Sequence, residues 1–230
     1  MDRTALVTGG TGGLGTAVVA RLLADGWRVV VPWVAEGELE RVERAPGLEL
    51  VQADLFDPEA VGSVVSAAAG DSSAPLLGVV NLVGGYAAGG RVHETPIEEF
   101  EAQFRVNLRP TYLVTRAALP HLLAAGEGSI VCVGTRAALR PFPGAAGYVS
   151  SKAAVIAFAQ ALAVEYRDDQ VRANAILPSV IDTPGNRASM PNADFERWVK
   201  PNEIAAVIAF LLSDDSAPTS GAAVPVYGRA

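Results

Sequence analysis

The feature that most restricts the fold is an alternation of short apolar runs with longer, helix-like segments along the whole chain. Several runs, such as RVVVPW and LLGVVNLV, are almost continuously apolar. Strands that are covered by helices on both faces have this character. The sequence therefore predicts an α/β fold: a doubly wound parallel sheet of about seven strands in three layers. The predicted strands cover residues 4–8, 28–33, 48–53, 76–83, 129–134, 171–177 and 222–227.

The segments between these runs are predicted to be helices. Two of them begin with proline or an acidic residue in the first turn, at Pro58 and Pro201, which is typical of helix starts. No internal repeat, low-complexity tract or linker divides the chain, so residues 1–230 are predicted to form one domain. The predicted helices cover about residues 13–25, 36–44, 57–69, 96–106, 108–125, 147–167 and 201–212.

Composition and charge narrow the choice of partners. Half of the 230 residues are apolar and 19% are charged, so a large core is expected. The 18 basic and 25 acidic side chains give a formal charge of −7, which argues against nucleic acid or an anionic membrane as the main partner. A local basic pocket for a small anion remains compatible with this balance.

Cysteine, histidine and the N-terminus carry little signal. The single cysteine, Cys132, lies in the apolar run SIVCVG and is expected to be buried. His93 and His121 have no cysteine or close histidine partner, so no metal site is predicted. The first apolar run is too short for a signal peptide, and no run approaches the roughly 20 apolar residues of a membrane span. A soluble cytoplasmic protein is the expectation.

A glycine-rich stretch, TGGTGGLG, follows the first predicted strand and opens the first helix. Gly10, Gly12 and Gly15 match G-x-G-x-x-G, while Gly9, Gly13 and Gly15 match the wider T-G-x-x-x-G-x-G spacing. Amides at a helix N-terminus bind phosphate, and glycines allow a pyrophosphate to approach closely. A purely structural turn is the alternative, and a P-loop is not, because no Gly-Lys-Ser/Thr follows. The context predicts a Rossmann-type dinucleotide site.

The end of the second strand normally indicates whether the adenosine ribose carries a 2′-phosphate. Here Trp33 occupies that position, and the next charges are Glu36, Glu38 and Glu40, with Arg41 after them. These glutamates could simply form a solvated face. Their field would still oppose a phosphate, so the sequence favours NAD over NADP weakly.

Tyr148 and Lys152 lie four residues apart in a predicted helix, and therefore on one helical face. The pair alone is compatible with a packed tyrosine and a solvated lysine. Beside a nicotinamide it could work as an acid and its electrostatic partner. The ammonium and the charge of an oxidised nicotinamide would lower the pKa of the phenol.

The spacing of Gly9, Gly13 and Gly15, together with Tyr148-x-x-x-Lys152, resembles the short-chain dehydrogenase/reductase family over nearly the whole chain. The resemblance implies an NAD(P)-dependent oxidoreductase in which a hydride is transferred to the substrate and the tyrosine supplies the proton. It also implies that the lysine holds the nicotinamide ribose.

Further positions match that family residue by residue. Asp54 matches the aspartate at the adenine, and the run NLVGG keeps Asn81 and Gly84 of the Asn-x-Ala-Gly turn, with valine in place of alanine. The run LPSVIDT resembles the Pro-Gly-x-x-x-Thr segment, so the Ile181 backbone and the Thr183 side chain are expected at the carboxamide. The residues expected at the cofactor are Thr8, Gly9, Gly10, Gly13, Leu14, Gly15, Trp33, Asp54, Leu55, Asn81, Val83, Gly84, Tyr148, Lys152, Pro178, Ile181 and Thr183.

The catalytic set implied by the resemblance departs from the family at one position. Thirteen residues before the tyrosine the family has a serine, and this chain has Thr135, whose hydroxyl could replace it or be misdirected by the extra methyl group. Asn107 matches the asparagine that supports a proton-relay water. The expected catalytic residues are Tyr148, Lys152, Thr135 and Asn107.

A narrower resemblance concerns two shorter segments. Residues 182–198, DTPGNRASMPNADFERW, resemble the substrate loop of dihydropteridine reductases, and residues 84–90 resemble their glycine-rich turn. Residues 184–200 are therefore predicted to be a substrate loop. Aromatic and apolar walls with a few polar anchors are usual in small-ligand sites, although any one candidate could be core or rim. The candidate substrate residues are Tyr86, Arg136, Phe142, Arg187, Met190, Phe195 and Trp198.

Three functions remain open at this point. The first is an NAD(P)-dependent reductase of a small planar or carbonyl substrate, with a quinonoid dihydropteridine as the first candidate. The others are a 3-oxoacyl or polyketide-type ketoreductase and a non-catalytic cofactor-binding sensor. The small residues around Tyr148 permit close helix contact, and in the family such helices form a homodimer or homotetramer.

Overall fold

The strand order of the sheet creates one natural binding crevice. The computed structural model describes residues 1–229 and contains a seven-stranded sheet in which all neighbouring strands are parallel, in the order β3-β2-β1-β4-β5-β6-β7. The order runs outward from β1 to β3 and then resumes at β4 on the other side of β1. Ligands of such sheets bind beyond the carboxyl ends of the strands at this reversal.

The strands coincide with the apolar runs of the sequence to within two residues. The α/β, doubly wound, Rossmann-type prediction is confirmed. The interior strand β1 is wholly buried, as expected for a strand covered on both faces. The strands are β1 (Thr4–Thr8), β2 (Arg28–Trp33), β3 (Leu48–Gln52), β4 (Leu76–Asn81), β5 (Gly128–Val133), β6 (Val171–Pro178) and β7 (Ala223–Val226).

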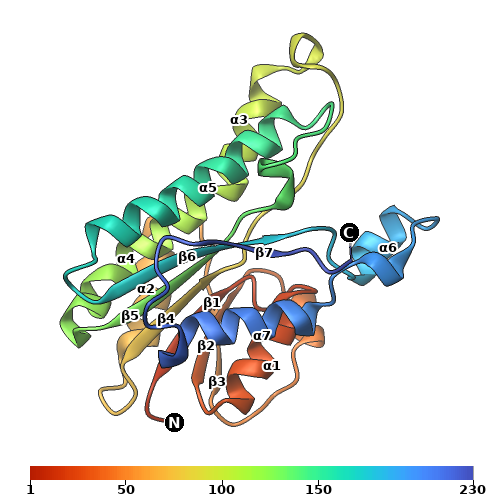
Figure 1. Cartoon of the computed structure of the whole chain (residues 1–230). Coiled ribbons are helices and arrows are strands. Elements are labelled where there is room, and N and C mark those ends of the chain that lie inside the picture. The colour runs from red at the N-terminus through yellow and green to blue at the C-terminus, as the bar shows by residue number, and fades with distance from the viewer. Residues whose placement is uncertain (230) are drawn as a thin grey trace.

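Helices cover both faces of the sheet, with a separate apolar core on each side. One core joins the sheet to α2, α4 and α5, and the other joins it to α1 and α7. Figure 1 shows these two layers, and α3 with its preceding loop rising beside α5 above the sheet. The helices are α1 (Gly15–Ala24), α2 (Pro58–Ala69), α3 (Ile97–Asn107), α4 (Arg109–Ala125), α5 (Ala146–Glu165), α6 (Pro184–Ser189) and α7 (Pro201–Leu212).

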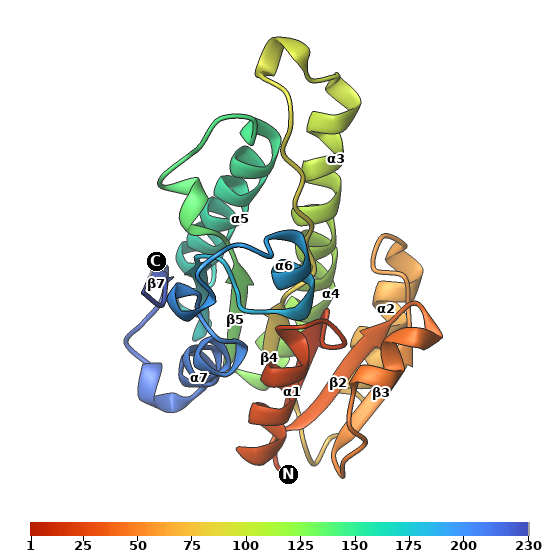
Figure 2. The same ribbon diagram turned by 90° about the vertical axis from the view of Figure 1, so that its right-hand side faces the viewer.

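Two segments differ from the sequence prediction. The helix predicted at 36–44 is a short 3₁₀ helix, η1 (Glu36–Arg41), with Gly37 inside it and no buried residue, so nothing stabilises a longer helix there. Within the predicted substrate loop, the short helix α6 begins at Pro184, where Thr183 accepts a hydrogen bond from the Asn186 amide. Figure 2 shows α6 in front of the sheet, above α1.

Helix α5 also corrects an expectation about apolar length. It has 20 residues and is long and apolar enough to cross a membrane by length and composition, which no run in the sequence was expected to be. The core helix of a soluble protein passes the same test. In the structure α5 packs against β5, β6 and α3 and carries the buried Lys152, so its apolar character serves the core.

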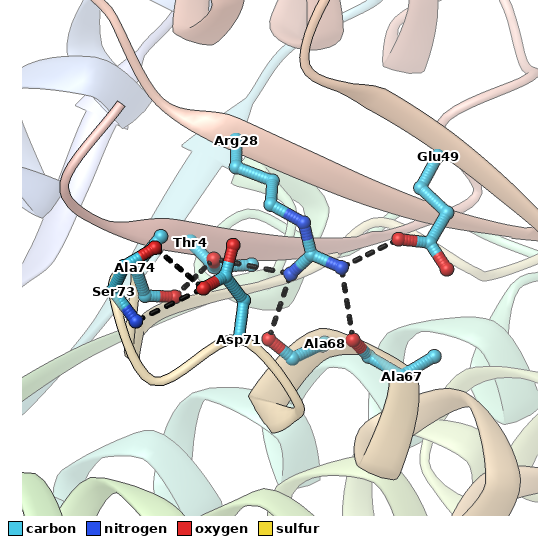
Figure 3. Close-up of polar contacts among 8 residues, drawn as sticks. All are labelled: Thr4, Arg28, Glu49, Ala67, Ala68, Asp71, Ser73 and Ala74. Carbon is cyan, nitrogen blue, oxygen red and sulfur yellow. Dashed lines mark hydrogen bonds and ion pairs between the residues drawn. The ribbon is translucent and has the colours of Figure 1, made fainter.

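Arginines on two strands cap the carboxyl ends of two helices. The Arg28 guanidinium on β2 donates to the carbonyl oxygens of Ala67 (3.0 Å) and Ala68 (3.1 Å) at the end of α2, and it also contacts the Thr4 hydroxyl (Figure 3). Its fourth partner is the half-exposed carboxylate of Glu49. A cation at this end of a helix is stabilised by the helix dipole and by carbonyl groups that lack helical partners.

Arg172 on β6 plays the same part for α7. It donates to the carbonyl oxygens of Leu211 (3.0 Å) and Ser213 (3.1 Å) and to the Ser216 hydroxyl (2.9 Å). Burial lowers the pKa of this guanidinium, and Asp214 opposes the shift. Both arginines lie at the amino-terminal ends of their strands, so this end of the sheet is used for stability.

We expect Arg28→Met to lower the free energy of unfolding by about 1–3 kcal/mol, because helix carbonyls and the Thr4 hydroxyl lose a partly buried charged donor. Glu49→Gln, the matched change at the exposed partner, should cost less than about 1 kcal/mol. Urea unfolding followed by circular dichroism measures both values. Equal losses in the two variants would contradict the capping role and indicate that the ion pair is what matters.

Candidate active site

The glycine-rich turn between β1 and α1 is folded back on itself. A Cβ at Gly15 would lie 2.0 Å from the Gly9 carbonyl oxygen, and one at Gly10 would lie 2.7 Å from Val31 of β2, so neither position admits a side chain. Gly9 has a φ of +65°, which favours glycine. Leu14 is the residue before α1. The turn therefore brings backbone directly against the first helix.

This turn fits a bound pyrophosphate. Within the described chain, the amides of Gly13 and Leu14 donate no hydrogen bond to protein acceptors, and they lie at the N-terminus of α1. Free amides and the helix dipole at such a terminus attract anions. A Cβ at Gly13 would lie 3.0 Å from the Thr183 methyl group, so the segment after β6 closes over the turn.

The ends of β1, β4 and β5 are aligned beside the turn. Thr8 pairs with Asn81, which pairs with Cys132. The Thr8 hydroxyl donates to the Val80 carbonyl oxygen at 3.4 Å and accepts a hydrogen bond from the Leu82 amide at 3.1 Å, which ties β1 to the segment after β4. The buried Asn81 amide donates to Thr115, but its side-chain oxygen has no partner among the described residues. The Asn81 side-chain oxygen is therefore available to accept a hydrogen bond from a ligand.

Gly84, Asn107 and Lys152 meet at the centre of the candidate site. A Cβ at Gly84 would lie 2.7 Å from Asn107 Oδ1 and 2.9 Å from Lys152 Nζ. Asn107 ends α3, and Lys152 lies on α5 with 6% of its surface exposed. The Lys152 ammonium donates to the Val133 carbonyl oxygen at 2.8 Å. Burial lowers the pKa of Lys152 to about 8, with Cys132 opposing the shift.

Tyr148 lies one helical turn before Lys152 and faces Thr135 and Tyr86. The rings of Tyr86 and Tyr148 are perpendicular, with centroids 5.0 Å apart. Burial raises the pKa of the Tyr148 phenol, while a hydrogen bond with the Thr135 hydroxyl opposes that shift. In the protein by itself desolvation is the largest effect on this pKa, whereas the sequence predicted a lowered pKa for the site that holds the nicotinamide. The prediction included the charge of an oxidised nicotinamide and remains a prediction for that state.

Thr135 is held so that its hydroxyl lies beside the phenol. It is 7% exposed, lies at the end of β5, and its oxygen accepts a hydrogen bond from the Ala137 amide at 3.3 Å. The same hydroxyl lies near enough to the Tyr148 phenol to oppose the rise of its pKa. The extra methyl group has therefore not turned the hydroxyl away from the tyrosine.

The Asn107 side chain is fully engaged with neighbouring protein groups. Its oxygen accepts a hydrogen bond from the Gly85 amide at 3.0 Å, and its nitrogen donates to the Gly85 carbonyl oxygen at 3.0 Å and to Ser151 at 3.1 Å. The Thr111 hydroxyl donates to the Asn107 carbonyl oxygen at 3.2 Å. These contacts make Asn107 a positioning group for the turn at residues 84–85, and a role in a relay stays a prediction.

The segment after β6 lies on the nicotinamide side of the predicted site. Pro178 is the buried last residue of β6. The Ile181 carbonyl oxygen accepts hydrogen bonds from the Thr183 amide (2.9 Å) and the Asn186 side chain (2.8 Å). The Thr183 oxygen accepts a hydrogen bond from the Asn186 amide at 3.3 Å, which leaves the hydroxyl hydrogen free for another acceptor.

On the adenosine side, the carboxyl ends of β2 and β3 carry the expected residues. Trp33 ends β2, and its carbonyl oxygen accepts a hydrogen bond from Ala53. Asp54 is exposed, and its carboxylate accepts a hydrogen bond from the Phe56 amide at 2.9 Å, while Leu55 is buried. Val83 is half-buried on the other side of the turn, with its amide 3.5 Å from the Thr8 hydroxyl.

The candidate substrate residues separate into groups. Arg187 forms a two-bond ion pair with Asp182 and lies 4.7 Å from the Phe195 ring, which in turn lies 4.8 Å from the Trp198 ring. Arg187 is engaged with Asp182 in the structure, and its role in substrate binding stays a prediction. The aspartate neutralises it within the segment. Trp198 is buried.

The remaining candidates lie apart from that cluster. Phe142 lines a cavity of about 450 Å³ whose walls include Val92 and Val149 but not Tyr148. The Arg136 guanidinium lies 5.2 Å from the Tyr227 ring, and Met190 is exposed. Tyr86, another of the seven candidates, packs its ring against that of Tyr148.

Sequence reasoning missed several groups that hold this site. Ser151 links Asn107 to the Tyr148 carbonyl oxygen, and the Val133 carbonyl binds the lysine. Thr11 donates to the Glu38 carboxylate at 2.8 Å across 27 residues of chain. A backbone carbonyl and a pairing between distant residues leave no pattern in one sequence, so no signal could have identified them.

Comparison with known proteins agrees with this geometry. A sequence model of the family described as Enoyl-(Acyl carrier protein) reductase matches residues 9–228. The 2-(R)-hydroxypropyl-CoM dehydrogenase of Xanthobacter autotrophicus is 32% identical, over 99% of this chain and 98% of that protein. The 3-oxoacyl-[acyl-carrier-protein] reductase MabA of Mycobacterium tuberculosis is 31% identical, over 99% of this chain and 92% of that protein.

Solved structures give the same result. The crystal structure of levodione reductase superposes with a TM-score of 0.91 at 31% identity, covering 99% of this chain and 97% of that chain. A short-chain type dehydrogenase/reductase from Mycobacterium ulcerans superposes with a TM-score of 0.90 at 27% identity, covering 100% and 90%. The chain belongs to the short-chain dehydrogenase/reductase family and is an NAD(P)-dependent oxidoreductase.

Proposed function

We propose that the protein reduces a small planar or carbonyl substrate, with Tyr148 as the proton donor and a quinonoid dihydropteridine as the first candidate substrate. The observation that carries the proposal is the meeting of Tyr148, Thr135 and Lys152 beside the turn at Gly84. When bound, the dihydronicotinamide supplies a hydride. The amides at Gly13 and Leu14 would hold its pyrophosphate, and Lys152 would hold its ribose.

The residues of the chain supply the proton and the orientation. A phenol whose pKa is raised by burial stays protonated at neutral pH, and it is then ready to give its proton to the substrate. The Thr135 hydroxyl lies where it can orient both the phenol and the accepting atom. The Lys152 ammonium, charged below about pH 8, would stabilise the tyrosinate that proton transfer leaves behind.

The pteridine candidate rests on the aromatic side of the site. Tyr86 is 63% exposed and contacts the Tyr148 ring by its edge or face, so one side of it is available to a flat substrate. The sequence similarity at residues 84–90 and 182–198 points the same way. The two curated relatives described above are not named for pteridines, so this candidate rests on the chain's own residues.

A ketoreductase is the second candidate, and the position of the Thr135 hydroxyl near the Tyr148 phenol favours it. Two hydroxyl groups that converge on one point suit a carbonyl oxygen as the reacting atom. MabA, named for 3-oxoacyl reduction, is 31% identical to this chain. The family membership argues against a sensor without turnover.

We also propose that the protein assembles as a homodimer or homotetramer through the outer faces of α4 and α5. Small side chains are exposed along α5 at Ala153, Ala157 and Ala161, and Tyr112 of α4 is 49% exposed. Small residues allow two helices to pack closely. A monomeric mass by light scattering would contradict this assembly.

Tyr148→Phe should reduce turnover about 10²-fold or more, because the ring is kept and only the proton donor is lost. NADH and NADPH oxidation with a chemically generated quinonoid dihydropterin, and with a panel of ketones, measures the effect. Cofactor binding should persist in the variant. Tyr112→Phe removes a hydroxyl from an exposed tyrosine and is the matched control. Undiminished turnover in Tyr148→Phe would refute the proposed proton donor.

Substitutions of Thr135 separate the two substrate candidates. For a ketone, Thr135→Val should lower kcat/KM about 10²-fold, because a nearly isosteric side chain no longer orients the carbonyl, while Thr135→Ser should keep activity. For a quinonoid pterin, which accepts hydride readily, the loss in Thr135→Val should stay below about tenfold. Activity with ketones and none with the pterin would remove the pteridine candidate.

The reaction should slow as the pH rises through about 8, because burial lowers the pKa of Lys152 and the ammonium is then lost. Below that pH the lysine is charged and the effect is absent. The chain has one other lysine, Lys200. NMR of the lysine ε-carbons in the free protein should find that the Lys152 signal titrates near pH 8. A Lys152 signal that changes only well above pH 8 would contradict the assignment.

A further inference from the structure

Glu38 is distinguished from its neighbours by a contact with the glycine-rich turn. Its carboxylate accepts a hydrogen bond from the Thr11 hydroxyl at 2.8 Å, and the residue is half-buried. Glu36 and Glu40 lie on the same 3₁₀ helix, are exposed, and make no side-chain hydrogen bond within residues 1–229. We propose that Glu38, fixed by Thr11, reads the adenosine ribose and excludes a 2′-phosphate, so that the protein prefers NAD(H).

The position of Thr11 carries the first step. Thr11 is 5% exposed and lies between Gly10 and Gly12 in the turn that follows β1. Gly10 packs against Val31 near the end of β2, since a Cβ there would meet both methyl groups of that valine. In folds of this type the pyrophosphate lies on the turn and the ribose lies over the carboxyl end of the second strand. A carboxylate bonded to Thr11 therefore borders the ribose.

The chemistry of the carboxylate carries the second step. One oxygen of Glu38 accepts the Thr11 hydrogen bond, so the other remains available to accept from a ribose 2′-hydroxyl. A 2′-phosphate would bring a second negative group against it, which is repelled at short range. None of the ion pairs formed within residues 1–229 includes Glu38, so no cation there neutralises it.

The end of β2 explains why this task falls to Glu38. Trp33 occupies the place where an acidic or basic residue would act on the ribose, and a tryptophan carries neither charge. The acidic group is supplied instead from η1, five residues later in the chain. Glu38 does not lie on the strand itself, and the hydrogen bond from the Thr11 hydroxyl fixes its carboxylate beside the turn.

The inference rests on the proposed dinucleotide site, so the test measures binding without a substrate. NADH and NADPH are titrated into the purified wild-type protein by isothermal calorimetry, and Glu38→Gln is compared with Glu36→Gln and Glu40→Gln. All three variants remove one negative charge. Thr11→Val removes the hydroxyl that fixes Glu38 and leaves the carboxylate in place. Circular dichroism checks that each variant is folded.

The wild type is expected to bind NADH at least about tenfold more tightly than NADPH, one tenfold step being about 1.4 kcal/mol. Glu38→Gln should reduce that ratio about tenfold, Thr11→Val should reduce it by a smaller factor, and the two control variants should change it less than about threefold. Equal effects of all three glutamate changes, or tighter binding of NADPH by the wild type, would overturn the inference. Folded wild type that binds neither dinucleotide would overturn the proposed function as well.

Discussion

The geometry of the site depends on the hydrogen bonds that the amide side chain of Asn107 makes. It bonds both the N–H and the carbonyl oxygen of Gly85, and it donates to Ser151, whose hydroxyl donates to the Tyr148 carbonyl oxygen. One buried group thus joins the end of α3, the turn after β4 and the first turns of α5. Because buried amides are costly to leave unpaired, this network fixes Tyr148 relative to the turn.

The two ends of the sheet are used for different purposes. At the amino-terminal ends of β2 and β6, Arg28 and Arg172 bind helix carbonyl oxygens and stabilise the packing of α2 and α7. At the carboxyl ends, glycines and short polar side chains leave backbone amides unpaired and helix N-termini accessible. The site can therefore keep open polar groups because the opposite end of the sheet is firmly capped.

The sequence predicted the sheet well because strands buried on both faces are nearly continuous apolar runs, and β1, β2 and α7 have the predicted bounds. It predicted a helix at residues 36–44 because charged residues suit helices, but Gly37 and the lack of a buried face leave only a 3₁₀ helix. It missed α6 because Pro184 and Gly185 together look like a loop.

The sequence identified site residues that lie close together in the chain. It missed contacts between residues that are far apart in the chain. The glycine turn and the pair of Tyr148 and Lys152 are readable within eight residues each. The contact of Thr11 with Glu38 is not, and neither is the bond from Lys152 to the Val133 carbonyl. The ion pair of Arg187 with Asp182 was also missed, because it depends on the turn that brings the two side chains together.

Burial acts on Tyr148 and Lys152 in opposite directions, and in the protein by itself it keeps the proton on the phenol. It raises the pKa of the phenol and lowers that of the ammonium, so the two groups are brought towards a state in which neither carries charge. A tyrosine that keeps its proton at neutral pH is prepared to donate it. Loss of that proton would require a positive charge beside the phenol that outweighs the effect of burial.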